Sequence, residues 1–155
     1  MKWKVTTSLL LAAMSMCTHA TVEYIDHFRE GELNVTEFEI DDTKVCSLGI
    51  GHDPVFVVMA TNTDMFIAAA NVNYASAKRF AYALDDHDVT YVEPFADNYM
   101  AFDSLGLPDL DAIADAEIMF VSAFPREANA IAKQAVYDLA SSDEAIAIFK
   151  DCLMD

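Results

Sequence analysis

The alternation of apolar and polar residues predicts that most of this chain folds as short antiparallel strands. Residues 35–40 place Phe38 and Ile40 on one face and Glu37 and Glu39 on the other, which is the two-residue period of a half-buried strand. Further strands, separated by turns rich in Asp, Asn and Gly, are expected at 44–50, 55–60, 65–74, 80–84, 89–93, 99–102 and 117–123. Residues 21–34 have a mixed period and indicate a loosely held strand or arm.

Two short helices are expected after the early strands. Asp109 is a capping residue type and begins a helical pattern that continues through Ala116. Near the end of the chain, Ser141 and Glu144 have the spacing of a capping box. One face of the helix that follows collects Ala145, Ile146, Phe149 and Cys152.

Residues 126–139 are compatible with either a helix or a strand. Apolar positions from Ala128 to Leu139 recur at helical spacing, and the segment is rich in good helix formers. Its second half, 133–139, fits a final strand equally well, so the spacing leaves both alternatives open.

Together these elements predict a mainly β protein, an antiparallel β-sandwich-like meander with a short internal helix and a C-terminal helix. Residues 21–155 are expected to form a single β-rich domain, because no repeat, low-complexity tract or linker divides them. An apolar fraction of 54% is sufficient for a real core.

The first twenty residues have the pattern of a cleaved secretory signal. Lys2 and Lys4 precede an apolar run over 5–16, which is shorter than the roughly 18 residues that a membrane-spanning helix needs. Thr18 and Ala20 put small side chains three and one positions before a cleavage site. We therefore expect cleavage after Ala20 and a periplasmic or secreted protein.

The alternative is a lipoprotein anchored through Cys17. A lipoprotein signal needs small residues before its cysteine, whereas Met14, Ser15 and Met16 stand there. Cleavage after Ala20 is the favoured interpretation, and it removes Cys17 with the signal.

Removal of Cys17 leaves Cys46 and Cys152 in an oxidising compartment, where two thiols usually form a disulfide. Such a bridge would close a loop of about 100 residues and add about 4 to 5 kcal/mol of stability. The alternatives are two independent buried thiols, or a cysteine nucleophile that uses one of three histidines: His27, His52 or His87.

The chain is strongly acidic, with 26 Asp and Glu against nine Lys and Arg and a formal charge of −17. Loss of the two signal lysines leaves seven basic residues against 26 acidic ones, a charge of −19. Such a field repels phosphate backbones and anionic lipids, which argues against nucleic-acid binding. We favour acidity as a source of solubility in a saline habitat over a dedicated cation-binding role.

The densest group of potential metal ligands is the turn Asp85, Asp86, His87 and Asp88. Its oxygens suit a hard cation such as Ca²⁺, but the spacing is not that of an EF-hand, and these residue types are common in hairpin turns. They are weak metal candidates. His52 and Asp53 before a proline are likewise better explained by a turn than by a catalytic dyad.

Catalytic motifs are absent from the sequence. No G-x-S-x-G or H-E-x-x-H occurs, and the stretch from Ser47 to Gly51 has no following helix to bind a phosphate. We expect no catalytic residue and no cofactor.

A family resemblance is carried by three features: the early cysteine Cys46, the stretch Tyr137-Asp138-Leu139, and the helix expected from Ala145 to Cys152. In them the chain resembles small exported bacterial proteins related to the invasion-associated locus B family. It departs from that pattern at Ala140-Ser141-Ser142, where a glycine is expected before the helix. The resemblance implies a periplasmic β-sandwich with a C-terminal helix, a role in the envelope or in host interaction, and a strand at 133–139.

These observations predict an exported, non-enzymatic binding or accessory protein of the bacterial envelope. Its partner would be an unknown protein or envelope component, with no nucleic acid and no membrane span after signal cleavage. The alternative is a cation-binding protein or metal-dependent hydrolase that uses the acidic turn Asp85–Asp88. An exposed apolar patch would favour the binding role.

Overall fold

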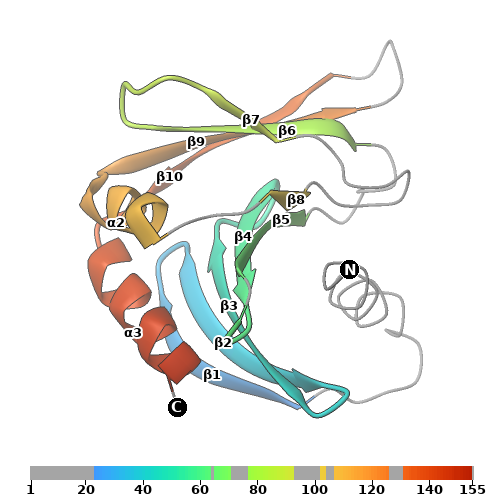
Figure 1. Ribbon diagram of the computed structural model, residues 1–155. Coiled ribbons are helices and arrows are strands. Elements are labelled where there is room, and N and C mark those ends of the chain that lie inside the picture. Colours follow the sequence, from blue (N-terminus) through green and yellow to red (C-terminus); the bar gives the residue numbers. More distant parts are fainter. Residues whose placement is uncertain are drawn as a thin grey trace.

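A computed structural model describes residues 23–63, 65–70, 77–92, 102–103, 107–125 and 131–154. The expected signal peptide, with Cys17 and the cleavage site after Ala20, lies outside these residues. The described chain is mainly β, with two antiparallel sheets and two helices (Figure 1).

The larger sheet, sheet A, has six strands, of which the first five form a meander. Its strands in spatial order are β1 (Tyr24–Glu30), β2 (Leu33–Ile40), β3 (Thr43–Ile50), β4 (Val55–Ala60), β5 (Met65–Ala70) and β8 (Phe102–Asp103). The sixth strand, β8, pairs with β5 after the chain has passed through the smaller sheet. The strands predicted at 35–40, 44–50 and 55–60 are confirmed as β2, β3 and β4. Residues 24–30 are more regular than expected, because β1 forms a hairpin with β2 around Gly31, whose φ is +54°.

The smaller sheet, sheet B, has four strands in the order β10-β9-β6-β7. These are β10 (Lys133–Asp138), β9 (Ile118–Pro125), β6 (Ala77–Leu84) and β7 (Thr90–Val92). The expected hairpin across the Asp85–Asp88 turn is present as β6 and β7. The end of the ambiguous segment is a strand, as the family resemblance implied, while 126–130 lie outside the described residues.

The helices are α2 (Leu107–Asp115) and α3 (Ser142–Met154). The predicted face of α3 is confirmed, because Ala145, Ile146, Phe149 and Cys152 are all buried. In α2, Asp109 lies in the first turn and Leu110 faces the core.

One hydrophobic core joins both sheets and both helices in a sandwich-like arrangement. A cross-strand row of sheet A, Val35, Leu48 and Val58, lies on the face that the other elements cover. Sheet B packs against one part of this face, and α3 contacts β1, β2 and β3 at the other part (Figure 1). The covered face of sheet A is therefore closed partly by sheet B and partly by α3.

Candidate functional site

The predicted disulfide joins the C-terminal helix to sheet A. Cys46 on β3 and Cys152 on α3 are bonded, with their Cα atoms 6.2 Å apart and a sequence separation of 106. Both residues are buried. Because both sulfurs are in the bridge, neither is a thiolate, and the cysteine-nucleophile alternative does not apply to this state.

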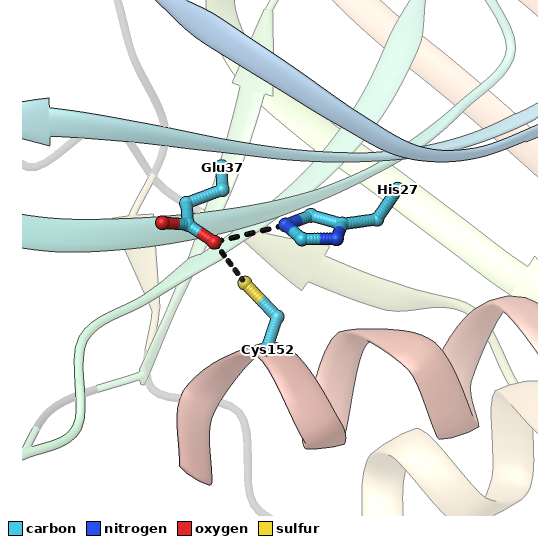
Figure 2. Close-up of side chains that lie close together, drawn as sticks. All are labelled: His27, Glu37 and Cys152. Atoms are coloured by element: carbon cyan, nitrogen blue, oxygen red, sulfur yellow. Dashed lines mark hydrogen bonds and ion pairs between the residues drawn. The ribbon is translucent and has the colours of Figure 1, made fainter. Parts of the chain in front are cut away.

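A carboxylate lies against this disulfide. The register places Glu37 of β2 directly opposite Cys46, so both side chains face α3. Glu37 Oε2 lies 3.8 Å from Cys152 Sγ (Figure 2). A bridged sulfur carries no hydrogen, so this is a packing contact and not a hydrogen bond.

A β-bulge directs His27 to the same carboxylate. The β1–β2 register shifts between Asp26 and Phe28, which leaves His27 as the extra residue, and bulges commonly re-aim a side chain. His27 Nε2 lies 2.9 Å from Glu37 Oε2 (Figure 2), and Lys44 Nζ lies 3.7 Å from that oxygen. Glu37 thus has two basic partners and a sulfur around one oxygen.

The group has metal-ligand chemistry that is incomplete in the disulfide form. Ligand atoms of His27, Glu37 and Cys152 all lie within 4.8 Å of one another, and no other group of three emerges from the described residues. Thiolates, and not bridged sulfurs, are the cysteine ligands of metals. In the oxidised chain, only the imidazole and the carboxylate are effective donors.

A pocket of about 500 Å³ opens beside the disulfide. Asp42, Thr43, Lys44 and Asn62 supply its polar lining, Leu153 and Met154 its apolar lining, and Cys46 borders it. Cys46 is fully buried, so it lies behind the pocket's surface and exposes no atoms to it. The pocket brings solvent close to the Lys44 end of the cluster.

The predicted acidic turn is used to hold two strands together. Asp85 Oδ1 accepts hydrogen bonds from the backbone N–H groups of Glu117 and Ile118, each at 3.0 Å, where β9 begins. Asp86, His87 and Asp88 are exposed. Among the described residues, these four side chains do not form a group of three converging ligand atoms.

Replacement of Asp85 by alanine is expected to lower the free energy of unfolding by about 1 to 3 kcal/mol, because two backbone N–H groups lose a charged acceptor. Asp85 also has a φ of +49°, which alanine tolerates poorly. Asp86→Ala is the matched control and should change stability by less than about 0.5 kcal/mol. Urea unfolding of both variants measures the difference, and equal stabilities would contradict this role for Asp85.

The three histidines lie on separate elements. His27 is on β1, His52 is in the β3–β4 turn and His87 is in the β6–β7 turn. His52 Nδ1 lies 3.1 Å from Glu32 Oε2, while Asp53 pairs instead with Lys133 Nζ at 2.9 Å. His52 and Asp53 therefore interact with different partners and do not form a dyad.

A buried tyrosine connects the two sheets and was not anticipated from the sequence. Tyr137 of β10 donates its hydroxyl hydrogen to Pro54 O at 2.6 Å, and its ring packs directly on Gly51. Burial raises the pKa of Tyr137, and the carboxylates of Glu32 and Asp53 add to that rise. The neutral hydroxyl is therefore the stable donor in the folded protein.

The outer face of sheet B carries exposed apolar side chains. Val136, Tyr91 and Phe120 are 57%, 53% and 41% exposed. Val136 pairs with Phe120 across β10 and β9, and the ring of Tyr91 lies 6.4 Å from that of Phe124. Neither described helix lies over this face (Figure 1). We call these four residues the outer apolar patch.

Acidic residues flank one end of the outer apolar patch. Asp86 and Asp88 lie in the β6–β7 turn, Glu117 precedes β9, and Asp138 ends β10, and all four are exposed. Because Asp138 pairs with Ile118, Asp138 of β10 and Glu117, just before β9, lie at the same end of sheet B. This surface therefore combines apolar area with negative charge.

Comparison of the chain with models of known protein families, with curated proteins and with solved structures gave no match.

Proposed function

We propose that this protein is an exported, non-enzymatic binding or accessory protein of the bacterial envelope, and that it docks a partner protein through the outer apolar patch. Export is supported by the signal-like first twenty residues and by the intramolecular disulfide between Cys46 and Cys152. In the described part of the chain, no helix has the length and apolar character needed to cross a bilayer.

The observation that carries the binding role is the exposure of Val136, Phe120 and Tyr91 together on one sheet face. Contiguous exposed apolar area on a folded domain marks interaction sites, and aromatic residues are enriched where partners bind. The buried residues of the same strands, such as Met119 and Val121, already fill the core. Val136 and Phe120 point to the opposite face and lie outside that core.

The charge around the patch indicates the chemistry of that partner. Asp86, Asp88, Glu117 and Asp138 make one end of the face acidic, and the whole chain has a formal charge of −17. A partner surface with apolar side chains bordered by Lys or Arg complements this arrangement, and opposite charge accelerates encounter. The proposed partner is therefore a protein with a basic, partly apolar surface.

Site-specific photo-crosslinking tests the proposal. A photoreactive phenylalanine derivative at position 136 should give a discrete adduct in living cells, whereas the same probe at Ile131, which is 91% exposed outside the strands, should not. The adduct protein, purified and titrated against this chain, should bind more weakly as salt rises, and Phe120→Asp should reduce its affinity at least tenfold. Equal adducts at both positions, or binding unaffected by Phe120→Asp, would reject the patch.

A further inference from the structure

We propose that the reduced chain holds one zinc-class divalent ion between α3 and the first strands of sheet A. The ligands are the sulfurs of Cys46 and Cys152, His27 Nε2 and Glu37 Oε2. Two thiolates, an imidazole and a carboxylate form a four-ligand set of the types that bind Zn²⁺. These atoms come from β1, β2, β3 and α3, so the folded protein assembles the site.

The spacing of three of these atoms, His27 Nε2, Glu37 Oε2 and Cys152 Sγ, is close to what a tetrahedral ion needs. Bonds of about 2.0 to 2.3 Å to zinc put neighbouring ligand atoms about 3.3 to 3.8 Å apart. Glu37 Oε2 already lies 3.8 Å from Cys152 Sγ and 2.9 Å from His27 Nε2 (Figure 2). Cys46 Sγ is not among the ligand atoms that lie within 4.8 Å of one another. On reduction the two sulfurs must therefore separate from bonding distance and Cys46 Sγ must move toward His27 and Glu37, and a Cα–Cα distance of 6.2 Å leaves room for this.

The disulfide and the ion exclude each other. A dithiol reductant gives two electrons and two protons to the Cys46–Cys152 bridge and closes its own disulfide, so that both protein sulfurs become thiols. Zn²⁺ then binds both as thiolates and releases two protons. The ion would replace the covalent link between α3 and β3, so the reduced chain would retain this connection.

The charges of the chain both favour and oppose the ion. The strongly acidic chain attracts cations, and Glu37 contributes a negative charge at the site itself. Lys44 opposes the ion, because its Nζ lies 3.7 Å from the same Glu37 oxygen. Lys44 is partly exposed and borders the pocket beside the disulfide, so its side chain can turn toward solvent.

Cobalt and zinc titrations test the site in the chain that begins at Thr21, where Cys17 is absent. The protein is reduced with a phosphine, which becomes the phosphine oxide, and is then desalted without oxygen. The reduced chain should bind one Co²⁺ with the visible bands of a tetrahedral ion and a sulfur-to-cobalt charge-transfer band, and one Zn²⁺ should displace it. The oxidised chain should show neither band.

Variants separate an assembled site from binding to loose cysteines. His27→Ala and Glu37→Gln should each weaken Zn²⁺ binding at least tenfold, whereas the matched control His52→Ala should leave it unchanged. Lys44→Met should tighten binding several-fold. The near-ultraviolet circular dichroism of the zinc-loaded chain should match that of the oxidised protein. Unaltered affinity in His27→Ala, or a zinc-loaded chain without that native signal, would overturn the proposal.

Discussion

Replacement of Cys46 and Cys152 together by alanine is expected to lower the free energy of unfolding by about 4 to 5 kcal/mol. The bridge spans 106 residues of sequence, and in the chain-entropy model the benefit grows with the length of the closed loop. A domain of this size has a total stability of about 5 to 15 kcal/mol, so the loss is a large fraction of it. Urea unfolding followed by circular dichroism measures the difference.

Two comparisons make this result specific to the covalent link. Asp151→Ala changes an exposed neighbour of Cys152 on the same helix and should alter stability by less than about 0.5 kcal/mol. The unsubstituted chain, reduced in the presence of a chelator, should lose about as much stability as the double variant. A loss below about 1 kcal/mol in both reduced and substituted chains would show that α3 is held by packing alone.

The disulfide could be predicted because the number of cysteines that remain after signal cleavage is enough to suggest it. If a signal peptide removes Cys17, an even number of cysteines remains, and the oxidising compartment expected for an exported protein would pair them. The α3 face was predictable for a similar reason, because Ala145, Ile146, Phe149 and Cys152 repeat at helical spacing within one local segment. Local periodicity and simple arithmetic need no knowledge of which other elements lie nearby.

The surroundings of the disulfide could not be predicted from local patterns. Alternation along β2 separates Glu37 from Phe38 but does not say which face the helix covers, and it is the face with Glu37. The bulge that aims His27 at this carboxylate is a property of strand pairing. The role of Asp85 could not be predicted locally either, because the backbone N–H groups that it accepts from lie 32 and 33 residues later in the chain.

The link between the sheets was missed for the same physical reason. Tyr137 follows Pro54 by 83 residues, and its ring packs on Gly51, so neither contact leaves a local pattern in the sequence. Local spacing for 126–139 fitted a helix as well as a strand, and pairing of β10 with β9 decides in favour of the strand. That pairing directs Tyr137 toward sheet A, which makes Gly51 the most constrained glycine among the described residues.

Gly51→Ala is expected to lower the free energy of unfolding by about 2 to 5 kcal/mol. The φ of Gly51 is +78°, and a left-handed conformation costs an alanine about 1 to 2 kcal/mol. Its Cβ would also overlap the ring of Tyr137. The buried ring cannot easily withdraw, because its hydroxyl is held by Pro54 O, so overpacking adds about 1 to 3 kcal/mol. Urea unfolding measures the total.

Gly31→Ala supplies the matched control, because Gly31 also has a positive φ, +54°, but nothing lies within 4 Å of the position of its Cβ. Gly31→Ala should lower the free energy of unfolding only by the backbone contribution of about 1 to 2 kcal/mol. In a Tyr137→Ala background the ring is gone, so Gly51→Ala should cost no more than Gly31→Ala does. This non-additivity is the signature of direct contact between the two residues. Equal losses for Gly51→Ala with and without the tyrosine ring would show that β10 does not press on the β3–β4 turn in solution.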